Sequence, residues 1–99
     1  MARLHNIHPG EVLNEEFLIL FSISVYKLSK ETDLPQTRIS QIIKGNRRIT
    51  ADTALRLSVY FENSAKFWLG LQDDFDIEEV TFDKSSILKS IKPFGAKVA

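Results

Sequence analysis

A group of basic and amide side chains stands out between Leu34 and Ala51. This segment, LPQTRISQIIKGNRRITA, holds four basic residues and no acidic one, in a chain of 99 residues whose formal net charge is zero. Guanidinium, ammonium and amide groups are the side-chain groups that hydrogen-bond to phosphate oxygens and to the edges of nucleotide bases. The segment therefore favours contact with a nucleic acid. The alternative is a solvated surface whose charge only aids solubility.

Other side chains that could do chemistry are arranged less favourably. His5, His8 and Glu11 carry zinc-binding atoms, but the chain has no cysteine and no third histidine, and the run HPGE is better explained as a helix start. Three adjacent carboxylate pairs could act as acid and base, although neighbouring helical residues point in different directions: Glu15 with Glu16, Asp73 with Asp74, and Glu78 with Glu79. Glycine-rich phosphate loops and nucleophile elbows are absent. We expect no enzyme activity, no metal and no other cofactor.

Length and composition indicate one small domain. With 43% hydrophobic residues the chain can form a single core, although a domain of this size often depends on a partner. Without cysteines there is no disulfide framework, so a reducing compartment presents no difficulty. The longest apolar run, FLILF, is far shorter than the roughly 20 residues that span a bilayer, and the N-terminus lacks an apolar signal core. We expect a cytoplasmic protein without a membrane partner.

Two helices are expected to precede the basic segment. Pro9 suits a first helical position, and Glu11 can reach back to the amide of His8. The i, i+4, i+7 spacing predicts an inward-facing stripe of Leu13, Phe17 and Leu20. A short second helix starts after one of two capping residues, Ser22 or Ser24, turns Leu28 and Ser29 inward, and ends at Asp33 in a left-handed turn.

Three further segments show helical spacing. Pro35 begins a helix with a buried edge of Ile39, Ile42 and Ile43, which Gly45 and Asn46 end. Thr50 caps a helix whose inward positions are Ala51, Ala54, Leu57, Ser58 and Phe61. Ser64 caps a last helix, to about residue 79, in which Trp68, Leu71, Gln72 and Phe75 share one face. The predicted fold is all-α, a compact bundle of about five helices in residues 1–80, with a weakly structured basic tail in residues 81–99.

The second and third of these helices, with their short connection, predict a helix-turn-helix. In that motif the second helix enters the DNA major groove while the first crosses the backbone. Anchoring by Ile39 and Ile42 leaves five side chains as candidate base readers: Gln36, Thr37, Arg38, Ser40 and Gln41. Four residues after the helix are expected to contact phosphates, which set register without reading sequence: Lys44, Asn46, Arg47 and Arg48.

Three stretches also resemble a known family. HPGEVLNEEFL, YKLSKETDLPQTRISQIIKGNRRITADTALRLSVYF and SAKFWLGLQDDFDIE are similar to the HigA (VapI) antitoxins of bacterial type II toxin–antitoxin systems, within the Xre/Cro-like helix-turn-helix group, over about residues 4–79. The resemblance implies a dimer that binds double-stranded operator DNA at its own operon and neutralises a HigB-like toxin that cleaves mRNA. It assigns the DNA-binding role to the same nine residues.

The chain departs from the family pattern at two positions. Val25 stands where many relatives begin the first motif helix with a glutamine that bonds a phosphate, so we expect this chain to make one fewer bond to the DNA backbone. Asp33 replaces the usual turn glycine, which is tolerable because aspartate enters left-handed turns more readily than most residues.

Aromatic and acidic residues of the last helix suggest two further contacts. Its apolar residues extend around too much of the circumference for a monomer's surface helix, which predicts core packing, a homodimer interface or both: Phe67, Trp68, Leu69, Leu71 and Phe75. A twofold dimer would place recognition helices about 34–36 Å apart, as a palindromic operator requires. Residues 52–79 hold seven acidic and two basic side chains. Six of these acidic residues, or Glu15 and Glu16 instead, form either a solvated face or a surface for a basic toxin: Glu62, Asp73, Asp74, Asp76, Glu78 and Glu79.

Two other functions are also compatible with the sequence. The chain could be a stand-alone repressor with no toxin partner. It could also be a protein-interaction module on a helix-turn-helix scaffold that no longer binds DNA, in which case binding would show negligible salt dependence and removing Arg38 would have no effect.

Overall fold

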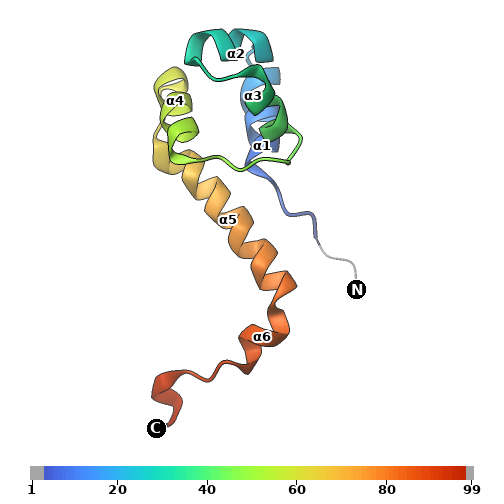
Figure 1. Ribbon diagram of the computed structural model, residues 1–99, viewed down its shortest axis with the longest axis vertical. Coiled ribbons are helices and arrows are strands. Elements are labelled where there is room, and N and C mark those ends of the chain that lie inside the picture. Colours follow the sequence, from blue (N-terminus) through green and yellow to red (C-terminus); the bar gives the residue numbers. More distant parts are fainter. Residues whose placement is uncertain (1–3, 98–99) are drawn as a thin grey trace.

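The computed structural model describes residues 4–97, which form helices joined by turns. In chain order these are α1 (Pro9–Val12), η1 (Leu13–Ile19), α2 (Val25–Thr32), α3 (Gln36–Ile43), α4 (Ala51–Phe61), α5 (Ala65–Asp83), α6 (Ser85–Ser90) and η2 (Phe94–Lys97). Helices α1 to α4 and the first part of α5 pack into one body, and the rest of α5 leads away from it to α6 and the C-terminus (Figure 1). Within residues 4–97 no helix is long and apolar enough to cross a membrane. The predicted all-α fold is confirmed.

The core lies where η1, α3, α4 and α5 meet. Its largest member, Trp68, has no exposed surface, and its ring lies 4.9 Å from that of Phe17. The indole N–H of Trp68 donates to Asn63 Oδ1 at 2.9 Å, so the buried ring keeps a polar partner. The other buried apolar residues come from η1, α2, α3, α4 and the segments on either side of α3: Leu13, Leu18, Leu28, Leu34, Ile39, Ile42, Ile49, Ala54 and Leu57.

The N-terminal run HPGE forms a capped helix start, as predicted. The amide of His8 donates to Glu11 Oε2 at 3.1 Å, and the amide of Gly10 donates to His8 Nδ1 at 2.9 Å. Gly10 lies against the end of α3, where a Cβ atom would fall 1.8 Å from the carbonyl oxygen of Ile42. The missing side chain therefore lets α1 touch the backbone of α3.

One predicted inward position in the first helix is wrong. Leu20 is 67% exposed, and Leu18 is buried in its place. The chain from Leu13 to Ile19 is π-helical, with i→i+5 hydrogen bonds that add about one residue to each turn. The face that begins at Leu13 therefore returns at Leu18, and an α-helical count misplaces the residues that follow.

In the second half of the chain the predicted helices form, but their bounds and some of their buried positions differ from the prediction. Ser64 caps α5 by accepting a hydrogen bond from the amide of Phe67 at 3.0 Å. Helix α5 continues to Asp83, so the predicted division after residue 80 falls inside it. The predicted inward position Ala51 is exposed at the start of α4. Helix α6 has six residues and buries none of them.

Candidate nucleic-acid interface

Helices α2 and α3 form a helix-turn-helix, joined by residues 33–35. Ser24 caps α2 by accepting from the amide of Lys27 at 3.0 Å, which decides between the two predicted caps. Asp33 has φ +59°, the left-handed turn conformation expected of it. Ile39 and Ile42 are 1% and 0% exposed, so they anchor α3 to the core. The orientation of α3 is therefore fixed by its apolar edge.

The outer face of α3 carries most of the predicted base readers. Gln36, Thr37 and Gln41 are exposed, and Ser40 is half-buried. None of the side-chain hydrogen bonds described for residues 4–97 engages these four. Their amide and hydroxyl groups can both donate and accept, which suits the mixed edges of bases in the major groove.

Arg38 is placed differently from its neighbours. Its side chain is 26% exposed, and Nη1 donates to Asp52 Oδ2 at 3.1 Å. Its Nε is buried and has no hydrogen-bond partner among the described residues. The guanidinium is therefore tied to the start of α4 rather than extended outward, which limits its reach as a base reader.

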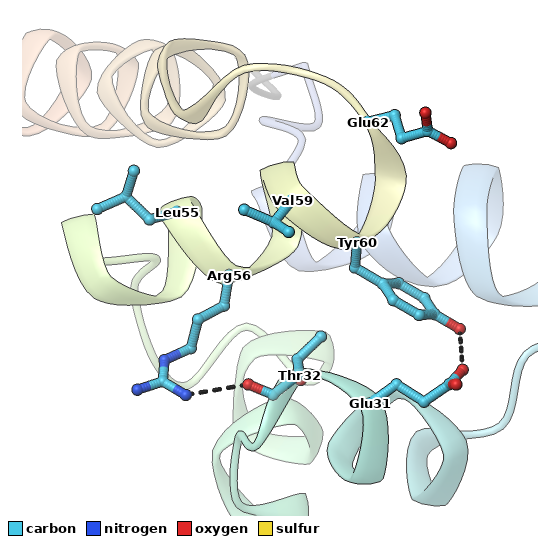
Figure 2. A pocket seen from close by; sticks show the side chains of 7 residues that line it. All are labelled: Glu31, Thr32, Leu55, Arg56, Val59, Tyr60 and Glu62. Atoms are coloured by element: carbon cyan, nitrogen blue, oxygen red, sulfur yellow. Dashed lines mark hydrogen bonds between the residues drawn. The ribbon is translucent and has the colours of Figure 1, made fainter.

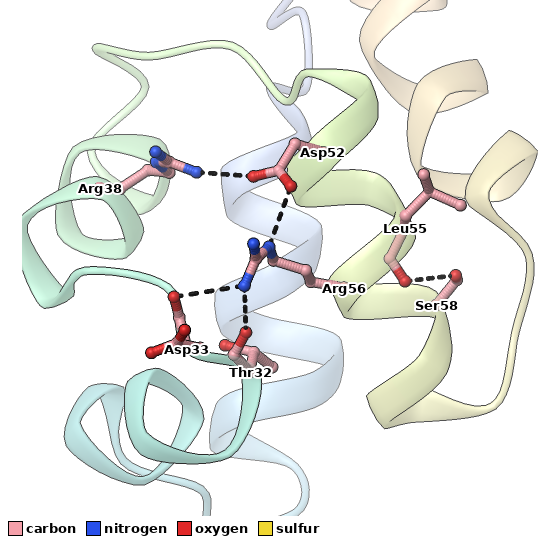
Figure 3. A network of polar contacts seen from close by, with 7 residues as sticks. All are labelled: Thr32, Asp33, Arg38, Asp52, Leu55, Arg56 and Ser58. Carbon is pink, nitrogen blue, oxygen red and sulfur yellow. Dashed lines mark hydrogen bonds and ion pairs between the residues drawn. The ribbon is translucent and has the colours of Figure 1, made fainter.

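Asp52 belongs to a network that fastens α4 to the turn of the motif (Figure 3). Its Oδ1 accepts from Arg56 Nε at 3.0 Å, and Arg56 Nη1 donates to the carbonyl oxygen of Thr32 at 3.0 Å and of Asp33 at 3.4 Å. The hydrogen bond from Arg56, and then the charge of that residue and the contact with Arg38, hold the pKa of Asp52 below its ordinary value. Asp52 thus stays charged between two arginines and links both motif helices to α4.

Hydrogen bonds at both ends of a shallow groove between α2 and α4 also hold these two helices together (Figure 2). The Tyr60 hydroxyl donates to Glu31 Oε1 at 2.6 Å, while Arg56 reaches Thr32 at the other end. The hydrogen bond to the Glu31 carboxylate raises the pKa of Tyr60. Leu55, Val59 and Glu62 complete the lining of this groove of about 690 Å³.

The segment after α3 presents the predicted phosphate contacts. Gly45 has φ +79°, a conformation that favours glycine, and it turns the chain out of the helix. Lys44, Asn46 and Arg47 are exposed. Arg48 is also exposed, but its Nη2 lies 2.8 Å from Asp76 Oδ2 on α5. Lys44, Asn46, Arg47 and Arg48 are hereafter called the basic loop, and they follow directly on the outer face of α3.

Helix α5 holds this loop through a buried amide. Gln72 is 2% exposed, and its Oε1 accepts from the amide of Ile49 at 2.7 Å. Its Nε2 donates to Asp76 Oδ1 at 2.9 Å. The backbone at the end of the basic loop is therefore fixed to α5 from inside the protein.

The predicted dimer residues separate into core and surface. Trp68 has no exposed surface in a single chain, so it packs as a core residue and offers no surface to a second copy. Leu69 and Leu71 are partly buried against the core, and Phe75 packs edge-on against His8 with ring centroids 4.8 Å apart. Phe67 is 40% exposed. The side of α5 that fills the centre of the body accounts for part of its surplus of apolar residues.

The residues first considered as metal ligands have other contacts. His5 Nε2 lies 2.8 Å from Glu11 Oε2, and His8 Nδ1 faces the amide of Gly10. The hydrogen bonds from His5 and from the His8 backbone lower the pKa of Glu11. In the part of the chain that the structure describes, no group of three or more His, Cys, Asp or Glu side chains is placed to hold a metal ion.

Four residues of the interface were missed in the sequence. The i, i+4 spacing of Asp52 and Arg56 was a usable signal for an ion pair on one helix. Gln72 was noticeable as an amide on an otherwise apolar face, and a buried amide must find partners. Nothing in the sequence pointed to the contact between Asp76 and Arg48, which lie 28 positions apart.

Comparison with known proteins gives a consistent assignment. The helix-turn-helix family model matches residues 15–68. Virulence-associated protein I of Dichelobacter nodosus is 44% identical over 81 residues, 82% of this chain and 75% of that protein. The structure of the Pseudomonas aeruginosa antitoxin HigA with the higBA promoter is 34% identical, with a TM-score of 0.86 over 91% of this chain and 99% of that one. A HigA-family addiction module antidote protein from Coxiella burnetii is 41% identical, with a TM-score of 0.85 over 92% of this chain and 100% of that one.

Proposed function

The chain belongs to the Xre-like helix-turn-helix family, among its HigA (VapI) type antitoxins, and we propose that it binds operator DNA and represses its own operon. The observation that carries this proposal is the outer face of α3. Gln36, Thr37 and Gln41 are exposed on a helix that Ile39 and Ile42 fix to the core, directly before the basic loop. The Pseudomonas aeruginosa relative was solved with promoter DNA, which supports the same use of the motif here.

In the proposed complex α3 lies in the major groove. Its exposed amides can form bidentate hydrogen bonds with adenine, and each good pair discriminates against a wrong base by about 1–3 kcal/mol. The basic loop then lies beside the phosphates, where its positive charges replace counterions. Base contacts set the sequence preference, while the loop supplies a large part of the affinity.

We further propose that the DNA-binding form is a homodimer. Apolar side chains remain exposed on the second half of α5, on α6 and directly after α6: Ile77, Val80, Ile87, Leu88 and Ile91. A second copy would cover such surface, and the twofold axis would place two α3 helices on the half-sites of a palindrome. Phe67, Leu69, Leu71 and Phe75 remain candidates for the same interface.

As an antitoxin the chain is proposed to neutralise a HigB-like ribonuclease. A protein that binds RNA is expected to have a basic surface, and Asp73 and Asp74 are exposed acidic residues on α5. Replacing both with lysine should slow association with the product of the adjacent gene, most strongly at low salt, while DNA affinity stays nearly unchanged. Asp76 is left out of this variant because it pairs with Arg48 in the basic loop. An unchanged association rate would move the toxin contact elsewhere, first to Glu15 and Glu16.

The DNA proposal is tested by measuring affinity for the duplex upstream of the gene and for an unrelated duplex across a salt series. Gln41→Ala should reduce the preference for the upstream duplex. Lys44→Ala should weaken both duplexes and lower the slope of log affinity against log salt by about 0.9 for each phosphate that is no longer neutralised. Lys66→Ala is the control, because it removes an exposed basic residue of α5 outside the motif.

Equal and weak binding of both duplexes would refute operator binding. It would favour the alternative of a protein-interaction module. If the upstream duplex is preferred but no toxin is encoded beside the gene, the chain acts as a stand-alone repressor.

A further inference from the structure

Arg48, the last residue of the basic loop, already has an anionic partner within the chain. Its Nη2 lies 2.8 Å from Asp76 Oδ2, with 58% and 35% of the two side chains exposed. The distance is that of a charge-assisted hydrogen bond. A phosphate would therefore meet a guanidinium that is in contact with a carboxylate, and the carboxylate would repel it.

The carboxylate is also held in place by the scaffold. Gln72 is almost fully buried, and its Oε1 accepts from the amide of Ile49. The amide nitrogen of Gln72 must then point the other way, where it donates to Asp76 Oδ1 at 2.9 Å. One oxygen of Asp76 is fixed by a buried group and the other faces Arg48. Of the two partners, the arginine is the one that can move toward DNA.

We propose that Asp76 is an internal counterion of Arg48, which competes with DNA phosphate and so limits the strength of sequence-independent DNA binding. The inference rests on the proposed DNA-binding function and assigns a regulating residue to the same surface. Contacts with phosphate supply essentially all of non-specific binding. A carboxylate that opposes one such contact weakens binding to every duplex, and exposed ion pairs of this kind are worth about two- to fivefold in an equilibrium constant.

The test compares Asp76→Asn with Asp74→Asn in binding both the upstream and the unrelated duplex across a salt series. The two substitutions remove the same charge from one helix, but their positions are about 200° apart around its axis, so Asp74 points away from Arg48. Asp76→Asn should tighten both duplexes about two- to fivefold per protomer and steepen the salt dependence. Asp74→Asn should produce a smaller change through net charge alone.

Repeating both substitutions in an Arg48→Ala background shows whether the effect passes through the arginine. The inference expects the advantage of Asp76→Asn over Asp74→Asn to disappear there. The inference is overturned if the two variants behave alike when Arg48 is present, or if the advantage of Asp76→Asn persists in the Arg48→Ala chain. It is also overturned if Asp76→Asn weakens DNA binding. If the unsubstituted chain binds neither duplex, the DNA-binding function itself is refuted and this inference with it.

Discussion

Gly10→Ala is expected to separate α1 from the end of α3. The new Cβ would lie 1.8 Å from the carbonyl oxygen of Ile42, where ordinary contact begins at 3.4 Å, a shortfall of 1.6 Å. The carbonyl carbon of Ile42 and the Cα of Ile43 are also within 3.0 Å, so only a backbone shift can relieve the overlap. Overpacking of a core usually costs about 1–3 kcal/mol, and replacing a helical glycine with alanine returns up to about 1 kcal/mol.

The steric term should win because no flexible side chain can yield. We expect a net loss of about 2 kcal/mol in the free energy of unfolding, or roughly 10 °C in Tm for a chain of this size. Because Ile42 belongs to α3, the shift should also move the proposed recognition helix and weaken operator binding. Urea unfolding at one fixed protein concentration measures the stability term, since a dimer's stability depends on concentration.

Gly70→Ala is the matched control. A Cβ at Gly70 in α5 would meet nothing within 4 Å. Alanine there should raise the free energy of unfolding by about 0.5–1 kcal/mol through helix propensity and a less flexible unfolded chain. The reasoning is refuted if Gly10→Ala is as stable as the original chain, or if the two substitutions change stability in the same direction.

Two further predictions concern buried polar groups. Burial lowers the pKa of His8, although the charges of Glu11 and Asp76 act in the opposite direction. As the pH falls, the unfolded chain therefore takes up a proton at His8 before the folded chain does. The contribution of neutral His8 to the free energy of unfolding is therefore fully present above its ordinary pKa of 6.5, and it decreases as the pH falls below that value. His8→Asn keeps a capping side chain and should flatten the pH dependence of urea unfolding between about pH 7.5 and 5.5. An unchanged pH dependence would contradict this prediction. Gln72→Leu should lower the free energy of unfolding by about 1–3 kcal/mol because the buried amide of Ile49 loses its acceptor. Hydrogen exchange at the Ile49 amide should accelerate. A variant that keeps both its stability and its protection from exchange would show that the hydrogen bond is dispensable.

Local chemistry in the sequence was enough to predict the motif. Ser24, Asp33, Gly45 and Ser64 delimit helices because caps and left-handed turns depend on the residue itself and on its near neighbours. The two isoleucines of α3 recur at helical spacing, so the outward face of that helix also follows from the sequence. These signals predict the helix-turn-helix without knowledge of any tertiary contact. The family was identified separately, from the resemblance of stretches that contain the runs HPGE, RITADTALRL and FWLGLQ.

The register of η1 was beyond local reasoning. Its π-helical hydrogen bonding brings Leu18 inward and Leu20 outward, and nothing in the spacing of apolar residues announces an extra residue per turn. The role of Gly10 was hidden for a related reason. A glycine in the first turn of a helix looks unfavourable until the backbone of α3 is seen against it.

The sequence by itself determined most of the helices, the caps at Ser24 and Ser64, the helix-turn-helix and the charge of the basic loop, because these depend on residue type and short-range spacing. Only the tertiary structure decided how that charge is used. Arg38 is tied to Asp52 and Arg48 to Asp76, across 14 and 28 positions of the chain. Such pairs arise from the packing of α4 and α5 against the motif, and helix packing brings together residues that sequence spacing does not relate.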